Sequence, residues 1–184
     1  MSSSDDEGDV VVMRVCAGVG CVETFGLEFD EGIGESFCTE CLQKLRQAEA
    51  DNDFRILLSA DDRGAIELIF NKFDFDRKGY WTFEEFNAYL EATDANRNDP
   101  VGPFDSNAEM SAYFDEEYAV PTASVDVPAA VVGLPEGTVT ISNIVTLEVM
   151  EKIYGGYMYH GVNALRDDVD ALEDAGEVNF DVLE

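Results

Sequence analysis

Apolar side chains recur at spacings of three and four on both sides of a short acidic segment. They are Ile66, Ile69, Phe70 and Phe73 before it, and Phe86, Tyr89 and Leu90 after it. This spacing is typical of amphipathic helices. The first helix has a marked start, because Ser59 can cap it and Asp62 follows where a carboxylate helps satisfy free backbone amides. The pattern predicts a helix-loop-helix unit over residues 59–93.

Breakers and composition divide the rest of the chain, and the predicted fold class is mostly α. We expect a disordered acidic tail at 1–9, a cysteine module and helix at 10–50, the helix-loop-helix unit within 51–94, a linker at 95–106 and a helical region at 107–184. Within the last region, a helix over 107–118 and a strand over 138–141 precede a helix that starts near residue 142. Gly155 and Gly156 are expected to end that helix.

The acidic segment between the first two helices carries oxygen ligands at regular positions. It reads Asp74-Phe75-Asp76-Arg77-Lys78-Gly79-Tyr80-Trp81-Thr82-Phe83-Glu84-Glu85. Ca²⁺ takes roughly six to eight oxygens, which EF-hand loops supply from positions 1, 3, 5, 7, 9 and 12, with glycine at position 6. The matching groups are the side chains of Asp74, Asp76, Thr82 and Glu85, the backbone carbonyl of Tyr80, and Gly79 at the turn. Residues 59–93 therefore resemble the EF-hand family, which implies one Ca²⁺ site.

Loop position 5 departs from the EF-hand pattern. It holds Lys78, whose ammonium group has only hydrogen-bond donors and cannot coordinate a cation. Three anionic ligands remain, so we expect weak Ca²⁺ binding or a structural EF-hand that holds no metal. If Ca²⁺ binds, it is expected to reorient the helices and change the exposure of four partner-binding side chains, Phe70, Phe73, Phe86 and Leu90.

EF-hands resemble one another in pairing through a short strand at loop positions 7 to 9, so a second hand is expected. Two segments combine a glycine with a strand pattern, at Gly137 with a loop over 132–143 and at Gly176 with a loop over 171–182. Neither has acidic groups at positions 1, 3 and 12 together. Both are interpreted as degenerate, EF-hand-like and metal-free, or as ordinary turns before strands.

Four cysteines form two close pairs near the N-terminus. Cys16 and Cys21 are separated by four residues, Cys38 and Cys41 by two, and sixteen residues lie between the pairs. Such spacing is typical of a tetrahedral Zn²⁺ site of four thiolates and resembles a zinc ribbon in general terms. The alternatives are reduced core cysteines or a redox pair. We expect one structural Zn²⁺ site, with no open coordination position for catalysis.

The strong negative charge of the chain limits the kinds of partner that it can bind. The chain has 40 Asp and Glu against 11 Lys and Arg, for a formal net charge of −29. This field repels nucleic acid and anionic lipid, and it favours protein partners with basic surfaces. Solubility or a halophilic origin would explain the acidity equally well. The acidic start of the chain and the lack of long apolar runs predict an intracellular protein, cytoplasmic or cytoskeletal rather than secreted.

Two functions follow from these residues. The first is a Ca²⁺-binding EF-hand protein that acts as a regulator or adaptor through protein-protein interaction. The second is a constitutive structural subunit of a large assembly, with structural zinc and a static EF-hand. We predict no enzymatic activity, because the chain has a single histidine, His160, and no phosphate-binding or nucleophile motif.

Overall fold

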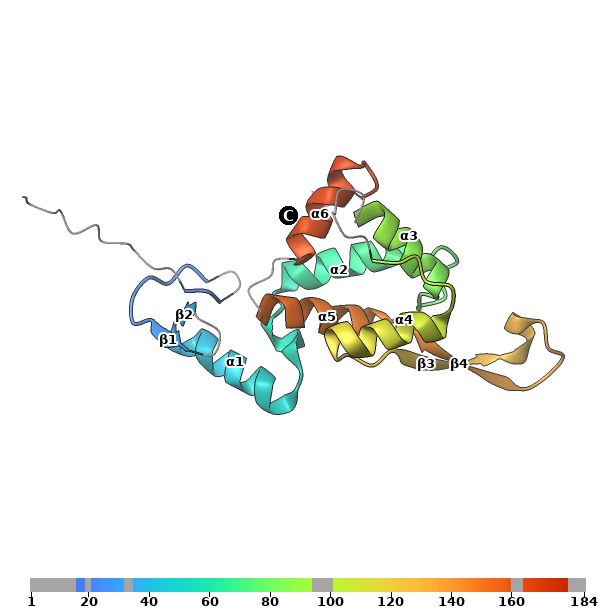
Figure 1. Ribbon diagram of the computed structural model, residues 1–184, viewed down its shortest axis with the longest axis horizontal. Coiled ribbons are helices and arrows are strands. Elements are labelled where there is room, and N and C mark those ends of the chain that lie inside the picture. The colour runs from blue at the N-terminus through green and yellow to red at the C-terminus, as the bar shows by residue number, and fades with distance from the viewer. Residues whose placement is uncertain (1–15, 19–20, 32–34, 94–100, 160–163, 179–184) are drawn as a thin grey trace, which may run out of the picture.

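The computed structural model describes residues 16–18, 21–31, 35–93, 101–159 and 164–178. The described chain is mostly helical, as predicted, with six α-helices and two small antiparallel sheets (Figure 1). The acidic tail at 1–9, the first half of the expected linker (95–100) and His160 lie outside these residues, as does the end of the candidate loop at 171–182.

The cysteine module forms one end of the molecule (Figure 1). Strands β1 (Glu28–Asp30) and β2 (Glu35–Phe37) form a hairpin that leads into helix α1 (Thr39–Asp51). A small core of Cys16, Phe37, Leu42 and Leu45 lies between them. The 3-10 turn η1 (Phe54–Leu57) then connects the module to the helical body.

The predicted helix-loop-helix is present as α2 (Ala60–Phe73) and α3 (Phe83–Thr93). The capping box that starts α2 is confirmed: Ser59 Oγ accepts from the Asp62 backbone N–H at 3.1 Å, and the Ser59 N–H donates to Asp62 Oδ2 at 2.8 Å. Trp81 is fully buried between the two helices, and its ring stacks on Phe70 with centroids 5.1 Å apart. The apolar faces therefore form a core.

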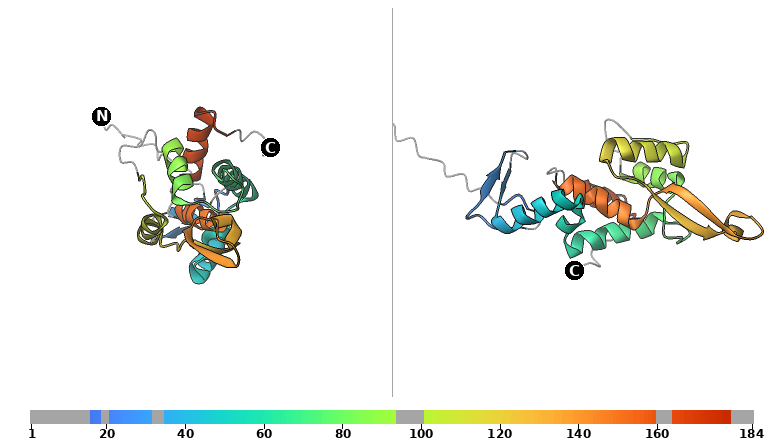
Figure 2. Two further views of the ribbon diagram at one scale, coloured as in Figure 1. Left: turned by 90° about the vertical axis from the view of Figure 1, so that its right-hand side faces the viewer. Right: turned by 90° about the horizontal axis from the view of Figure 1, so that it is seen from below.

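The second half of the body contains a long β-hairpin inserted between two helices. Helix α4 (Asn107–Tyr113) continues into a π-helical turn, η2 (Phe114–Tyr118), and strands β3 (Ala123–Pro128) and β4 (Thr138–Ile144) follow, joined through the 3-10 turn η3 (Ala129–Val132). Helices α5 (Leu147–Tyr159) and α6 (Ala164–Asp174) complete the body. The hairpin projects well beyond the helices (Figures 1 and 2).

A two-bond β-bridge joins the acidic loop to the second half. The Trp81 N–H donates to the Val145 carbonyl at 2.7 Å, and the Val145 N–H donates to the Trp81 carbonyl at 3.0 Å. Trp81 is the eighth residue of the loop, so the bridge falls within loop positions 7 to 9, where the sequence led us to expect pairing. Residues 138–141 were expected to pair with the acidic loop, and this prediction is wrong. They belong to β4 and pair with β3 instead.

Two predicted boundaries of the following helix are also wrong. Strand β4 extends to Ile144, so α5 starts at Leu147 rather than near residue 142. The helix then passes through Gly155 and Gly156, which were expected to end it. A Cβ at Gly155 would lie 2.6 Å from the Phe54 carbonyl oxygen, so this glycine allows α5 to pack closely on η1.

A buried hydrogen-bond cluster fastens three helices together. The hydroxyls of Tyr89 on α3 and Tyr154 on α5 lie 2.7 Å apart, and both donate to Asp168 Oδ2 on α6, at 2.6 and 2.8 Å. Burial, together with the nearby Tyr89 and Asp168, raises the pKa of Tyr154 well above its usual value. A polar cluster with these bonds made favours one arrangement of the helices.

Candidate metal centres

Two clusters of metal-ligating side chains occur within the described part of the chain. The first contains Cys16, Cys21, Cys38 and Cys41, with all four sulfurs within 4.8 Å of one another. The second contains the carboxylates of Asp74, Asp76 and Glu85, whose oxygens meet the same limit. Both clusters bring together residues that the sequence had already grouped.

The cysteine cluster is assembled from a loop and the start of α1. Cys16 and Cys21 come from the loop before β1, whereas Cys38 is the N-cap residue of α1 and Cys41 lies in its first turn. The Cys16 sulfur accepts hydrogen bonds from the Cys38 N–H at 3.1 Å and the Gly18 N–H at 3.4 Å. Donors of this kind and a helix N-terminus both stabilise negative charge on sulfur.

The environments of the four thiols differ. A hydrogen bond from the Cys41 backbone lowers the pKa of the Cys38 thiol to about 7. Burial raises the pKa of the Cys41 thiol instead. A cation that binds here would therefore meet a partly ionised cluster and would displace the remaining thiol protons, because thiolates are the ligands.

The spacing of the sulfurs suits a tetrahedral metal better than disulfides. Four thiolates at about 2.3 Å from Zn²⁺ stand roughly 3.8 Å apart, whereas a disulfide needs about 2.05 Å. The Cys21 and Cys38 sulfurs lie 3.8 Å apart, and all four cysteines are free thiols. The residues present thus fit a closed four-sulfur site.

Gly18 gives a direct test of this packing. A Cβ at Gly18 would lie 2.3 Å from the Cys41 sulfur, which is far inside van der Waals contact. We expect Gly18→Ala to push the two cysteine pairs apart and to weaken Zn²⁺ binding by about tenfold or more. Competition with a colorimetric chelator measures this change. Ala17→Ser at the exposed neighbouring position is the control, and equal affinity of both variants would contradict the packing.

The acidic loop is shaped by Asp74 and by two residues with positive φ. Asp74 accepts from the Lys78 N–H at 3.0 Å and the Gly79 N–H at 2.7 Å. Gly79 has φ 81° and Arg77 has φ 56°. Glu85 accepts from the Phe75 N–H at 3.2 Å and the Thr82 N–H at 2.9 Å, which closes the loop onto α3.

The Lys78 ammonium group lies inside the acidic cluster. Its Nζ is 2.8 Å from Asp76 Oδ1 and 3.6 Å from Asp74 Oδ1, and it also forms an ion pair and hydrogen bond with Glu85 Oε1. Asp74 and Glu85 are buried, and Asp76 is exposed. A single protein cation therefore contacts all three carboxylates predicted to bind Ca²⁺.

The charges in this cluster reinforce one another. Burial lowers the pKa of Lys78, but hydrogen bonds to Asp76 and Glu85 outweigh it and leave the pKa raised. The same hydrogen bond from Lys78 lowers the pKa of Asp76. The raised pKa keeps Lys78 charged as pH rises, and the lowered pKa keeps Asp76 charged as pH falls. The ion pair is thus present throughout the neutral range.

The other predicted site residues lie in different environments. Thr82 Oγ1 lies 3.4 Å from Glu85 Oε2, and the Tyr80 side chain is buried with Lys78 Nζ 5.1 Å from its ring centre. The four side chains predicted to bind a partner, Phe70, Phe73, Phe86 and Leu90, are all buried in the core. They form no partner surface in this conformation, because they pack around Trp81 and against the second half.

The sequence identified Lys78 at loop position 5 but did not predict that its ammonium group contacts the three carboxylates, nor that Val145 bridges to Trp81. The signal for Lys78 was present, because its long stem starts at a loop position that normally points a ligand at the cation. No local signal marks Val145, because α3, α4 and the inserted hairpin separate it from Trp81 in the sequence.

No protein-family model, curated protein or solved structure matched the chain. Among the described residues, no helix is both long enough and apolar enough to cross a membrane.

Proposed function

We propose that this chain is a constitutive protein-interaction subunit, built on a static EF-hand-like frame and a zinc-stabilised module. The observation that carries the proposal is the ammonium group of Lys78, which contacts Asp74, Asp76 and Glu85 together. The Lys78 ammonium group thus takes the place of a bound metal cation in the loop. The two helices of the hand are then held in one arrangement without a metal.

Competition between Lys78 and Ca²⁺ favours the lysine. The ammonium group is tethered within the loop, so it rebinds without any cost of bringing two molecules together. Ca²⁺ would have to displace it and would still lack the oxygen that loop position 5 normally supplies. The displaced ammonium would also remain close to the bound divalent cation, which it repels.

The packing of the body also supports a static frame. The bridge between Trp81 and Val145 joins the loop to the second half, and the bonds among Tyr89, Tyr154 and Asp168 fasten α3 to α5 and α6. Opening α2 away from α3 would expose the core that these contacts enclose. Such an opening is costly, because each large apolar side chain is worth about 1.5–3 kcal/mol when buried.

The competing proposal is a Ca²⁺-dependent regulator. It is favoured by three carboxylates that converge within 4.8 Å and by the left-handed glycine at loop position 6. In that case Ca²⁺ would displace Lys78 and release the helices. Both proposals share protein partners with basic surfaces and assign no catalytic role.

A titration that follows Trp81 distinguishes the two proposals. Trp81 is the only tryptophan and lies within the loop, in contact with both helices. We expect no change in its emission and no heat of binding up to about 1 mM Ca²⁺ at moderate ionic strength. A saturable change in the micromolar range would overturn the static frame and support the regulator.

A further inference from the structure

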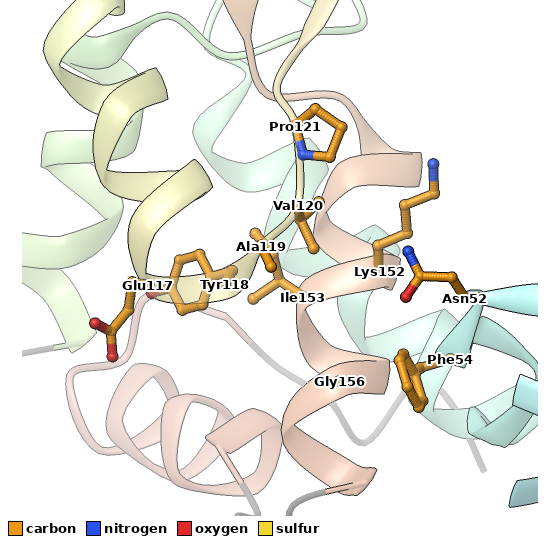
Figure 3. A pocket seen from close by; sticks show the side chains of 10 residues that line it. All are labelled: Asn52, Phe54, Glu117, Tyr118, Ala119, Val120, Pro121, Lys152, Ile153 and Gly156. Carbon is orange, nitrogen blue, oxygen red and sulfur yellow. The ribbon is translucent and has the colours of Figure 1, made fainter. Parts of the chain in front are cut away.

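A cavity lies where the cysteine module joins the helical body (Figure 3). Its volume is about 370 Å³, and its apolar lining comes from Phe54, Tyr118, Val120, Pro121 and Ile153. Asn52 and Lys152 lie on one side and Glu117 on the other (Figure 3). Cavities of a few hundred cubic ångströms with apolar walls and a few polar groups are typical of binding sites.

The floor of the cavity depends on two adjacent glycines with opposite surroundings. Gly155 faces η1, and a Cβ there would lie 2.6 Å from the Phe54 carbonyl oxygen. Gly156 lines the cavity, and a Cβ there would meet no atom within 4 Å. The first glycine lets α5 approach the module, whereas the second leaves empty the space that a side chain would fill.

The wall opposite the module has an uncommon backbone. The π-helical turn Phe114–Tyr118 ends there, and Ala119 after it has φ 51°, a left-handed conformation that alanine rarely adopts. π-Helical turns are rare in proteins, and those that occur are often found at functional sites. Strained residues of this kind persist where the surrounding structure requires them. Here they place Tyr118 and Val120 on the cavity wall.

Charge indicates the chemistry of the occupant. Glu117 lines the cavity, Asp115 and Glu116 directly precede it in η2, and all three side chains are exposed. Among the described residues, no Lys or Arg forms an ion pair with them. Lys152 is engaged by Glu148 at 3.0 Å. No Lys or Arg occurs between Arg97 and Lys152 in the sequence. Within the described chain, the side of the cavity that holds Glu117 therefore presents unpaired negative charge, whereas Lys152 on the opposite side is paired with Glu148.

We propose that this cavity is a docking site for a peptide segment of a partner protein, with an apolar anchor side chain flanked by Arg or Lys. The anchor enters between Phe54 and Ile153 above Gly156, and the basic residues lie against the acids at 115–117. Anchors in a pocket supply most of the affinity, and exposed charge pairs at its edge set specificity and the rate of association. This proposal rests on the interaction role proposed above and names the surface that carries it.

Gly156→Leu tests the site in the full chain. A Cβ at this position meets no atom within 4 Å, and leucine is a better helix former than glycine, so we expect the larger side chain to occupy the cavity and helix α5 to be kept. The probe is a short fluorescein-labelled peptide in which leucines are flanked by arginines, followed by fluorescence anisotropy. We expect saturable binding to the wild type with a dissociation constant on the order of 10–100 μM, weakened about tenfold or more by Gly156→Leu.

Matched peptides and a second protein variant separate the apolar and the charged contributions to peptide binding. Replacing the peptide leucines by serine should abolish saturable binding, and replacing its arginines by glutamate should do the same. Glu116→Gln with Glu117→Gln should weaken binding about threefold and reduce its dependence on salt. Equal affinity for wild type and Gly156→Leu, or no saturable binding below about 1 mM, would overturn the docking site. Neither result bears on the Ca²⁺ titration, so failure of the site is distinct from failure of the static frame.

Discussion

Lys78→Asn is expected to give the chain a Ca²⁺ response that the wild type lacks. The substitution removes the cation that contacts Asp74, Asp76 and Glu85, and it adds an amide oxygen at loop position 5. We expect a dissociation constant for Ca²⁺ of about 10–100 μM, read from Trp81 emission and from the heat of binding. Without Ca²⁺, the carboxylates repel one another and the free energy of unfolding should fall by about 1–2 kcal/mol.

Lys72→Asn is the matched control for this substitution. Lys72 pairs with Glu177 at the surface at 2.8 Å, away from the acidic loop. The control should show neither the Ca²⁺ response nor the loss of stability, because exposed ion pairs contribute little. A Lys78→Asn protein that stays insensitive to millimolar Ca²⁺ would mean that the loop cannot bind the ion even without its lysine.

Cys38→Ser is expected to remove the metal and unfold the cysteine module. Cys38 stands at the N-cap position of α1, and its sulfur lies among the other three, so its loss leaves at most three thiolates. Structural zinc contributes roughly 10–16 kcal/mol to the folding of small metal-dependent units, far more than the small core around Leu42 and Leu45 can replace. We expect about one equivalent of zinc in the wild type and very little in the variant.

Limited proteolysis and Trp81 emission locate the damage. Cleavage should appear within residues 16–57 of the variant, and the emission of Trp81 should stay that of a buried indole. Thr39→Ser, beside the site but not part of it, should resemble the wild type in both measurements. Unchanged zinc content in Cys38→Ser would exclude a four-thiolate site.

Local patterns predicted the parts of the fold whose signals lie within a few residues. The capping box at Ser59 and the apolar spacing on α2 and α3 follow from short-range rules, and so does the close spacing within each of the two cysteine pairs. The helical class followed for the same reason. Each of these features is determined by neighbours in the sequence, so one chain sufficed to find it.

Long-range packing accounts for what the patterns missed. Gly155 and Gly156 have the composition of a helix end, yet α5 continues through them because η1 packs against Gly155. Residues 138–141 have the pattern of a strand, but nothing local shows that they pair with β3. Nor does any local pattern show that Val145, just after β4, forms the bridge with Trp81. These missed features involve contacts between segments that are distant in the sequence, whereas the missed contacts of Lys78 are local.

The burial of Trp81 has a practical consequence for following the two halves of the chain separately. All seven tyrosines and the single tryptophan lie at or after Tyr80, so the cysteine module contains no residue that emits on excitation near 280 nm. Intrinsic fluorescence therefore reports on the helical body, and the reactivity of thiols toward an alkylating reagent reports on the module, because every cysteine is there. Comparing the two signals during denaturation would show whether the units unfold together or in turn.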